Sequence, residues 1–472
     1  MIRRAGGTPG LAARATLLSV TVLGTMCNNI VNVPLRAIAR DLDASLAATV
    51  LCVSAFVLAL AVAMPVTGWV GDRFGQRRTL SLALVLMLVA QALAAFAPNL
   101  PTLVALRGLQ GLACSAIPPM VMGLLGALNP GRRLEVMGAW AAANGVGQAI
   151  GPPVGGLISD AVGWRFIFVA LTAACAVVIV MMWLFVAEVP RRPTPFDARG
   201  AFLMTVGVGL VLVAVTSFSQ RGGDVRVAGL ELVVGVLMLL GYGVVSRGRP
   251  TAMIPLPVLR ETRFLRSTVA AFGQMFCLGT VLVALPLYFT GPLGVSSASA
   301  GALFFTLPAV MAVAAPATSR ISLRFGPRRV LRLGLAILVV STVVTGVIAG
   351  AGDGTPTVVA LTAMLAVLGL GMALVQTPAA AGATGSRAGG YGAAVGLYNL
   401  VRFSGSGTAA AWVAFTYPLG SMPLLFGGCS TVVLLGLLAN LVGRDPEGLV
   451  TDGSVSRTTR RDRPAVRSQR GR

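Results

Sequence analysis

Residues 68–78 read Gly68-Trp69-Val70-Gly71-Asp72-Arg73-Phe74-Gly75-Gln76-Arg77-Arg78, a short basic segment between two long apolar runs. A second copy of its last eight residues occurs far downstream as Ser322-Leu323-Arg324-Phe325-Gly326-Pro327-Arg328-Arg329, and five of the eight positions are identical. Because both copies follow an apolar run, they indicate an internal duplication in which the second copy has lost the acid. Repeats of this kind are typical of transporters.

The composition predicts a membrane protein. Hydrophobic residues make up 56% of the 472 residues, charged residues make up only 11%, and the mean hydropathy is +0.85. A soluble domain is about 45–50% apolar and about 25% charged. A helix needs roughly 20 apolar residues to cross a bilayer, and uncharged runs such as 80–106 are at least this long. The sequence therefore predicts an all-α polytopic membrane protein surrounded by the lipid bilayer.

Fourteen runs have the length and apolarity of membrane spans. Their approximate ranges are 15–35, 45–67, 79–97, 102–124, 135–158, 166–187, 200–219, 228–246, 268–290, 299–318, 330–350, 356–378, 391–415 and 421–442. The breaks between them carry arginine clusters on one side and short turns on the other. An even number of spans places both termini on the same side of the membrane.

The arginines predict the orientation of these spans. All 37 basic residues are Arg, and neither Lys nor His occurs. With both termini inside, 30 arginines fall on inner segments and 5 on outer loops, while Arg107 and Arg402 lie within spans. This bias predicts a multi-pass protein of the plasma membrane with both termini cytoplasmic. It also accounts for the net charge of +22 without nucleic acid as a partner.

Residue types that catalysis or metal binding would need are scarce. The six cysteines lie in apolar runs without paired spacing and without any His nearby, which favours packing over a disulfide or metal site. None of the fifteen acids lies at the middle of a predicted span. The chain has no Lys and hence no G-x-x-x-x-G-K-[ST] motif, so pumping driven by ATP is not expected. We therefore expect no enzyme activity, no metal and no cofactor.

The segment 68–78 resembles the loop 2–3 signature of the major facilitator superfamily, G-x-x-x-D-R-x-G-x-R-[RK]. The residues that carry this resemblance are Gly68, Gly71, Asp72, Arg73, Gly75, Arg77 and Arg78. The resemblance implies a conformational latch, in which the acid pairs with an arginine or with a helix N-terminus across a domain interface. The alternative is a solvated basic loop that only fixes the topology.

Two further motifs resemble those of drug exporters in this superfamily. In span 4, the drug-antiporter pattern L-x-x-x-R-x-x-Q-G is matched by Arg107, Gln110 and Gly111, and its arginine is tied to proton coupling in the family. In span 5, the antiporter signature of efflux members is matched by Gly147, Gly151, Pro152, Gly155 and Gly156. Spaced glycines allow close helix contacts and prolines bend a helix, so ordinary packing is the alternative for the span 5 motif.

The span count resembles the fourteen-helix drug:proton antiporter branch. That branch implies the major facilitator fold, with two six-helix bundles and two inserted helices. By this resemblance the chain divides into a cytoplasmic N-terminal arm (1–14), an N-terminal bundle (15–187), the inserted helices with flanking loops (188–266), a C-terminal bundle (267–442) and a disordered basic cytoplasmic tail (443–472).

Span 1 departs from the pattern of this branch. The family pattern L-D-x-[TS]-I-V-N-V-A-L-P has an acid where this chain has Cys27. A proton carrier needs a titratable group, usually Asp, Glu or His, and no such group lies at mid-membrane. The candidate carriers are therefore peripheral: Asp72, Glu135 and Asp160.

An acid-free cavity with two arginines is expected between the bundles. The candidate coupling and substrate residues are Arg107, Gln110, Gly111, Asn28, Asn29, Asn32, Asn144, Gln148, Tyr288, Asn399 and Arg402. Hydrogen bonding between helices is the alternative role of each amide. Such a cavity should prefer neutral or anionic amphiphiles, because a cation would meet like charge in a weakly screening medium.

These patterns together predict a secondary exporter of small amphiphilic compounds, such as drugs or antibiotics, that works by alternating access with proton antiport. The alternatives are an uncoupled facilitator or an uptake transporter of the same superfamily. A third is a receptor or scaffold without transport, suggested by the acid lost at Cys27.

Overall fold

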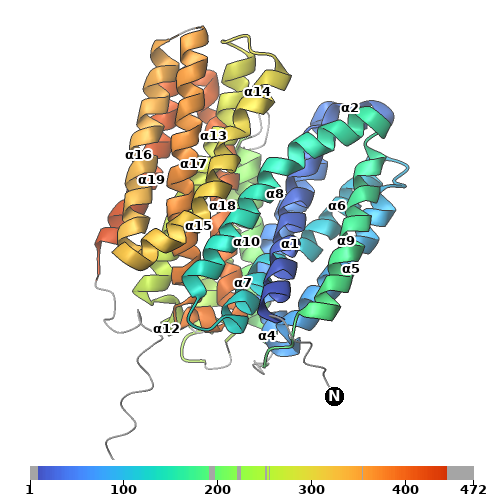
Figure 1. Ribbon diagram of the computed structural model, residues 1–472, viewed down its shortest axis with the longest axis vertical. Coiled ribbons are helices and arrows are strands. Elements are labelled where there is room, and N and C mark those ends of the chain that lie inside the picture. Colours follow the sequence, from blue (N-terminus) through green and yellow to red (C-terminus); the bar gives the residue numbers. More distant parts are fainter. Residues whose placement is uncertain are drawn as a thin grey trace, which may run out of the picture.

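The computed structural model describes residues 9–190, 197–219, 225–249, 252–254, 256–352 and 354–443. Within these ranges the chain is helical and contains no strand. Long helices run side by side and are joined by short connections (Figure 1). This is the expected all-α architecture, since a backbone that crosses lipid must satisfy its hydrogen bonds within its own segment.

The first six predicted spans are formed by helices α1 to α9. Their bounds are α1 Pro9–Asn29, continued by the 3-10 turn η1 Ile30–Asn32, α2 Leu35–Asp41, α3 Leu46–Thr49, α4 Leu51–Phe74, α5 Gln76–Ala94, α6 Leu100–Cys114, α7 Ile117–Leu128, α8 Arg133–Val162 and α9 Arg165–Phe185. Span 4 is divided into α6 and α7, with the break just before Pro118.

The remaining spans are formed by helices α10 to α19. Their bounds are α10 Ala198–Ser219, α11 Val225–Val245, α12 Leu256–Leu259, α13 Thr262–Thr290, α14 Ser297–Phe304, α15 Thr306–Phe325, α16 Pro327–Ala351, α17 Thr355–Thr384, η2 Ala388–Gly390, α18 Gly392–Thr416, η3 Tyr417–Leu419 and α19 Met422–Leu441. Span 10 is divided into α14 and α15 at Phe305.

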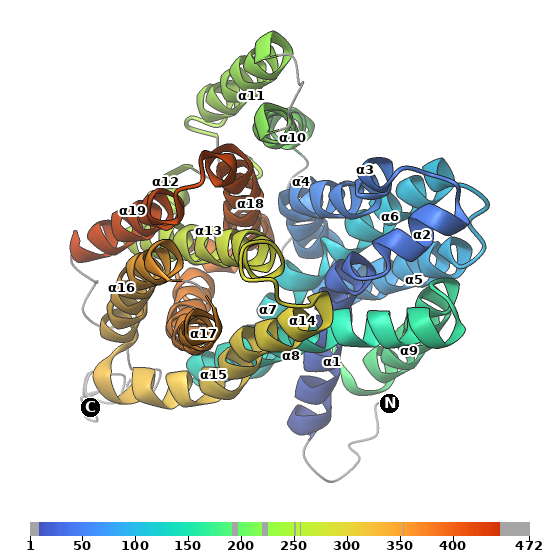
Figure 2. The same cartoon turned by 90° about the horizontal axis from the view of Figure 1, so that it is seen from above.

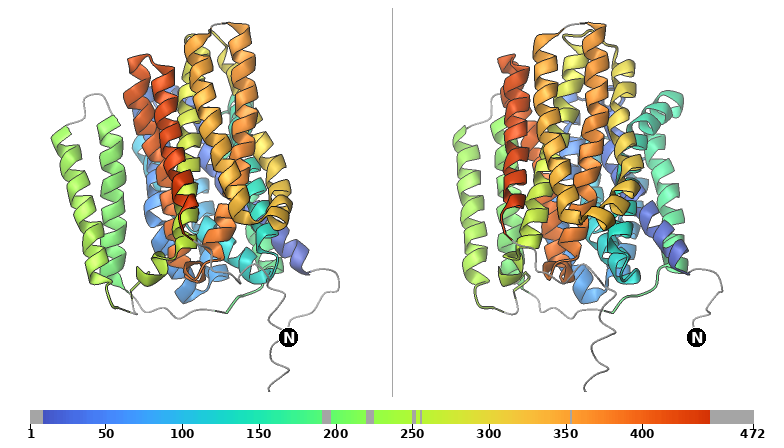
Figure 3. Two further views of the ribbon diagram at one scale, coloured as in Figure 1. Left: turned by 90° about the vertical axis from the view of Figure 1, so that its left-hand side faces the viewer. Right: turned by 60° about the vertical axis from the view of Figure 1, so that its left-hand side comes forward.

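The helices form two bundles and a separate hairpin. Helices α1 to α9 make one bundle and α13 to α19 make the other (Figure 2). The bundles contact each other mainly through α4 with α18 and α8 with α15, and we call these contacts the α4–α18 seam and the α8–α15 seam. Helix α8 also contacts α17, and α7 contacts α18. The α10–α11 hairpin lies outside both bundles, and α10 contacts α4 and α18 (Figure 3). The grouping follows the order that the resemblance implies, while the five domain boundaries stay predictions.

Twelve helical segments of the described chain are long and apolar enough to cross a membrane. The two predicted spans outside this set are α8 and α18, which have 30 and 25 residues. Both carry buried polar side chains, including Asn144 in α8 and Arg402 in α18. Both also lie at the seams, where a polar face contacts protein and not lipid.

The segment 68–78 is almost entirely helical, which corrects the expectation of a loop. Helix α4 continues to Phe74 and α5 begins at Gln76, so Gly75 alone connects them. Its φ of 101° lies in a region that favours glycine. The second copy folds in the same way, with Gly326 at φ 89° alone between α15 and α16. The sequence repeat is therefore also a structural repeat.

The two glycine corners mark one end of the molecule, which we call the corner end. Helix α1 begins and α19 ends at this end (Figure 1). Helix α1 begins at Pro9, which is inside the predicted N-terminal arm. Residues 444–472 of the predicted tail lie outside the described residues.

Candidate functional site

Asp72 lies in the last turn of α4, at the corner end of the α4–α18 seam. Its Oδ2 accepts a hydrogen bond of 2.6 Å from the backbone N–H of Gly392, the first residue of α18. The Asp72 side chain is only 6% exposed. The carboxylate is therefore held against the positive N-terminal end of a helix from the other bundle, which is one of the two pairings that the sequence resemblance implies.

Glycines bring the two backbones together at this seam. A Cβ on Gly68 would meet the carbonyl oxygen of Gly392, and a Cβ on Gly396 would meet that of Met64. The four-residue spacing puts both α18 glycines on one face of the helix, as in other small-residue contacts between membrane helices. Gly71 packs instead against α7. A larger side chain at Gly68 or Gly396 would force the seam open.

Two arginines of the first repeat, Arg77 and Arg78, hold the N-terminal bundle together. Arg77 donates a hydrogen bond of 2.9 Å to the carbonyl oxygen of Trp183 near the end of α9. Arg78 forms an ion pair of 2.9 Å with Glu188, which follows α9. Arg73 is exposed at the surface. Arg77 and Arg78 thus connect the start of α5 to the end of α9.

The second bundle contact is also closed near the corner end. Arg133, at the start of α8, donates a hydrogen bond of 2.8 Å to the carbonyl oxygen of Thr384 at the end of α17. Further along α8, Gly138 lies against Ser319 of α15. Both bundle contacts are therefore tight at the end where Asp72 lies.

The predicted antiporter residues pack α8 against α1. They are Gly147, Gly151, Pro152, Gly155 and Gly156, and all lie within α8. A Cβ on Gly147 would meet the hydroxyl of Thr25, and a Cβ on Gly155 would meet the carbonyl oxygen of Ile30. Backbone contact between helices, which the spacing of the glycines predicts, is the arrangement that these atoms adopt.

A cavity of about 110 Å³ lies between the two bundles, lined by α1, α4, α7, α8, α13 and α18. It brings together four of the predicted residues: Asn28, Asn29, Asn144 and Gln148. Gln148 donates a hydrogen bond of 2.7 Å to Oδ1 of Asn144. No acidic side chain is among the described residues that line this cavity. Pockets for drug-sized ligands have volumes of about 300–1,000 Å³, so the cavity in this conformation is smaller than such a pocket.

Arg107 does not line the cavity, contrary to the prediction, but lies inside the N-terminal bundle. Its guanidinium is fully buried and donates hydrogen bonds to the carbonyl oxygens of Cys27 (3.0 Å) and Cys52 (3.3 Å) and to Oε1 of Gln110 (2.9 Å). It also stacks on Phe56, 4.3 Å from the ring centroid. These contacts join α1, α4 and α6, so the local arrangement of Arg107 is that of a packing residue.

Arg402 is also fully buried, but its surroundings are different. Among the described residues, none of its three guanidinium nitrogens has a hydrogen-bond partner. The guanidinium lies 5.2 Å from the ring centroid of Trp140 and 4.9 Å from that of Phe403. Both aromatic residues line the cavity between the bundles. Arg402 thus lies directly behind the cavity wall, and its charge has no counterion in the described chain.

Other buried polar groups of the C-terminal bundle share this property. Side-chain atoms without a hydrogen-bond partner in the described part of the chain belong to Gln274, Gln376, Thr377, Tyr398 and Asn399. These residues come from α13, α17 and α18. Most buried polar groups in proteins are paired, so this polar interior is unusual for a region that only packs.

Four further predicted residues lie away from the cavity. Asn32 is exposed in the turn after α1, and Gly111 packs against the backbone of α4. The hydroxyl of Tyr288 donates a hydrogen bond of 2.7 Å to the carbonyl oxygen of Ala349, which joins α13 to α16. The amide of Asn399 donates to a carbonyl one turn earlier in its own helix.

Among the lining residues that were not predicted from the sequence are the aromatic residues Trp140 and Phe403. A signal for Trp140 was available, because Trp140, Asn144 and Gln148 are spaced by four residues and so share one face of a helix. Phe403 follows Arg402 directly in the sequence, but helical periodicity alone does not put neighbouring residues on one face.

The sequence of this chain is similar to those of known membrane transport and resistance proteins. The family described as Major Facilitator Superfamily matches residues 17–411. The tetracenomycin C resistance and export protein of Streptomyces glaucescens is 29% identical over 336 residues, which are 69% of this chain and 62% of that protein. The puromycin resistance protein of Streptomyces alboniger is 29% identical over 316 residues, 66% of this chain and 62% of that protein.

Two further similarities are to another curated protein and to a solved structure. The fatty acid resistance protein FarB of Neisseria gonorrhoeae is 30% identical over 304 residues, 62% of this chain and 57% of that protein. The chain spans about three-fifths of the length of these curated relatives. Among solved structures, the human organic anion transporter MFSD10 (TETRAN) superposes with a TM-score of 0.68 at 16% identity, over 91% of this chain and 99% of that chain. This last similarity shows a shared fold.

Proposed function

Since the chain belongs to the Major Facilitator Superfamily and is a multi-pass membrane transporter, we propose that it exports small neutral or anionic amphiphiles by alternating access. Its curated relatives include antibiotic resistance and export proteins. The direction of transport and the class of substrate are parts of this proposal.

The observation that carries the proposal is Arg402. Its guanidinium is fully buried and has no hydrogen-bond partner among the described residues. An unpaired buried charge is costly and is retained where it has a function. Two aromatic side chains of the cavity wall, Trp140 and Phe403, lie against it. A bound anion beside this wall would provide the missing counterion.

The rest of the cavity lining agrees with this substrate class. No acid is present among the described lining residues, and the amides Asn28, Asn144 and Gln148 supply neutral hydrogen-bonding groups. A cation would meet the positive field of Arg402 in a weakly screening interior. The fatty acid resistance protein FarB, a relative at 30% identity, carries the name of an anionic amphiphile.

We propose that Asp72 is the latch of the alternating-access cycle. The hydrogen bond from Gly392 links the two bundles at the corner end. Both bundle contacts are tight there, as expected for a conformation closed on that side. With 30 of 37 arginines assigned to the same side by the sequence, we propose that the corner end faces the cytoplasm and that the protein lies in the plasma membrane.

Proton antiport is the finer part of the proposal, and the acids differ in how well they suit it. Glu135 is paired with Arg14 (2.9 Å) and Arg132 (2.8 Å), and Asp160 is exposed. Asp72 is buried at a seam whose opening would change its surroundings, so it is the best candidate for a coupled proton. The acid-free cavity favours uncoupled facilitated export as the second candidate function.

The proposal is tested by efflux from loaded vesicles. An anionic fluorescent amphiphile is compared with ethidium in the presence and absence of a proton gradient. Arg402→Gln should lower anion efflux by about tenfold or more, because one charge-assisted interaction is lost. Arg165→Gln is the matched control, since Arg165 also stacks on a tryptophan but is partly exposed and is not among the residues that line the cavity.

The ethidium and proton-gradient measurements test different parts of the proposal. Strong export of ethidium driven by the gradient, unchanged in Arg402→Gln, would contradict both the substrate class and the role of Arg402. Anion efflux that persists at full rate after collapse of the proton gradient would select uncoupled export over antiport.

A further inference from the structure

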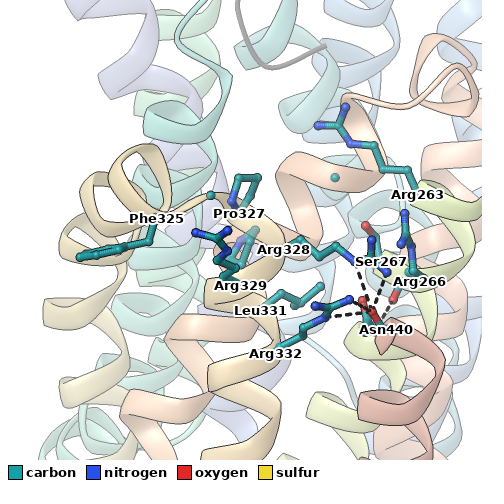
Figure 4. Close-up of a pocket in the computed structure, with 13 residues that line it drawn as sticks. Arg263, Arg266, Ser267, Phe325, Pro327, Arg328, Arg329, Leu331, Arg332 and Asn440 are labelled. Atoms are coloured by element: carbon teal, nitrogen blue, oxygen red, sulfur yellow. Dashed lines mark hydrogen bonds between the residues drawn. The ribbon is translucent and has the colours of Figure 1, made fainter. Parts of the chain in front are cut away.

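A second cavity, of about 350 Å³, opens beside the second glycine corner (Figure 4). Five arginines from α13 and the start of α16 line it: Arg263, Arg266, Arg328, Arg329 and Arg332. The described part of its lining contains no acidic side chain. We call it the basic corner cavity.

Three of these arginines also cap the end of α19. Arg328 donates a hydrogen bond of 2.6 Å to the carbonyl oxygen of Gly443, and Arg332 donates one of 2.9 Å to that of Asn440. Arg266, only 6% exposed, donates to the same chain end. Figure 4 shows these side chains converging on Asn440. The C-terminal end of a helix carries about half an elementary negative charge. This charge balances only a small part of the positive charge of five guanidinium groups.

Three of the five lining arginines have no described acid as an ion-pair partner. Within the described residues no carboxylate pairs with Arg263, Arg329 or Arg332. Arginines that are fixed at one edge of a cavity and lack carboxylate partners favour an anion with several oxygens, such as a phosphate.

One apolar side chain of the cavity lining, Phe325, is 53% exposed. Leu323 and Leu333, which are near lining residues in the sequence but do not line the cavity, are 67% and 53% exposed. These residues lie on α15 and α16, among helices long and apolar enough to cross a membrane. Exposed apolar side chains beside arginines are typical of the boundary between hydrocarbon and headgroups. A soluble anion would gain nothing from these exposed apolar side chains.

We propose that the basic corner cavity binds the phosphate of an anionic phospholipid, with the acyl chains lying along α15 and α16. The position equivalent to Asp72 in this copy of the repeat is Leu323, so the second corner has no carboxylate of its own at that point. The first corner is closed by the contact of Asp72 with Gly392, whereas the second takes its negative charge from the membrane. This inference does not depend on which compound the protein transports.

The test uses the full chain, purified and stripped of lipid, with binding measured by native mass spectrometry. The probes are phosphatidylglycerol, phosphatidylcholine and glycerol 3-phosphate. Arg263→Gln/Arg329→Gln removes two lining arginines that make no backbone contact at α19. Arg247→Gln/Arg249→Gln removes the same charge from exposed positions after α11 and is the matched control.

Phosphatidylglycerol should bind more tightly than phosphatidylcholine, and the cavity variant should bind it about 25-fold more weakly, since each arginine near an anionic headgroup contributes about a factor of five. The control variant should bind as the wild type does. Equal binding of both lipids, or equal loss in both variants, would overturn the proposal. Displacement of the lipid by equimolar glycerol 3-phosphate would overturn the lipid assignment in favour of a soluble phosphate ester.

The acidic residues that follow Gly443 in the sequence are the alternative source of negative charge. They are Asp445, Glu447, Asp452 and Asp462. Changing Glu447 to Gln and the three aspartates to Asn should leave phosphatidylglycerol binding unchanged. A marked gain of binding in this variant would identify the chain's own tail as the occupant and would overturn the proposal.

Discussion

Arg107 and Arg402 are both fully buried in helices of the two bundles, and both stack on aromatic rings. Arg107 uses its guanidinium to hold three helices together through two backbone carbonyls and the amide of Gln110. Arg402 makes no hydrogen bond among the described residues, and its aromatic neighbours come from both bundles. Two of the three guanidinium nitrogens are therefore hydrogen-bonded in Arg107, and none in Arg402 among the described residues.

This difference in hydrogen bonding indicates that the charge of Arg107 has a structural role, whereas the charge of Arg402 is available to a ligand. Replacing a bonded buried group leaves its former partners unsatisfied, which costs stability. Replacing an unpaired buried charge by a neutral group removes a desolvation cost, so stability is kept or improved. Measurements of stability and of transport should thus respond oppositely at the two positions.

The largest effect is expected for Arg107→Ala. It removes three hydrogen bonds to buried acceptors and leaves a void beside Phe56, so the folded state should lose about 3 kcal/mol or more. Thermal unfolding of the purified protein and its abundance in the membrane measure this loss. A normal unfolding temperature combined with lost anion transport would reverse the comparison and assign Arg107 to the substrate.

The next effect concerns Arg402→Gln, which should reduce anion efflux by about tenfold or more at unchanged abundance. Its unfolding temperature should equal or exceed that of the wild type, because an unpaired buried charge is removed. Arg402→Lys keeps the charge and should retain more transport than Arg402→Gln. A large loss of stability in Arg402→Gln would show that Arg402 packs as Arg107 does.

A smaller effect is expected at the latch. Asp72→Asn removes the negative charge at the start of α18 but keeps the shape of the side chain. Capping and helix-dipole interactions together are worth about 1 kcal/mol, so transport should change about fivefold while abundance stays normal. Efflux at matched expression measures it. Unchanged transport would show that the contact with Gly392 does not limit the cycle.

The smallest effect on stability is expected for Asp41→Asn. Asp41 is the ion-pair partner of Arg165, which serves as the reference for an arginine that has a carboxylate partner. Arg165 stacks on Trp164, 4.4 Å from the ring centroid, and forms an ion pair with Asp41. The hydrogen bond from Arg165 lowers the pKa of Asp41. The pair is exposed to solvent, so Asp41→Asn should cost only about 0.5 kcal/mol at neutral pH.

The pH dependence of this effect has a defined sign. A carboxyl whose pKa is lowered by folding stabilises the protein above its ordinary pKa of about 3.9, and this contribution is lost as the pH falls through the lowered value. The difference in unfolding temperature between Asp41→Asn and the wild type should therefore shrink towards low pH. A difference that grows on acidification would contradict the pairing.

The fold was largely predictable because length and apolarity are local properties. All fourteen predicted spans coincide with long helices of the structure, including α8 and α18, whose polar residues exclude them from a purely hydropathic count. The breaks within spans 4 and 10 were not predictable in the same way, since Pro118 lies in one broken span while Pro286 lies inside an unbroken α13. Whether a proline interrupts a membrane helix depends on its neighbours.

The candidate site was predictable only in part, because it depends on which bundle face each residue takes. Four amides reached the cavity as expected, but Arg107 points into its own bundle and Tyr288 bonds to α16. The sequence showed two arginines in spans and gave no means to tell a bonded one from an unbonded one. That distinction requires the distances to backbone carbonyls, which are set by helix packing.

The one-residue corners at Gly75 and Gly326 have a mechanical consequence. Consecutive Cα atoms are about 3.8 Å apart, so two helices joined by one residue form an elbow that can bend but cannot lengthen. Arg77 and Arg78 fix α5, the second helix of the first corner, to the end of α9. A movement of α4 away from α18 would therefore also rotate α5 and α9. Asp72 would therefore move away from Gly392 by a rigid-body rotation of α4, α5 and α9 together, and not by the bending of α4 alone.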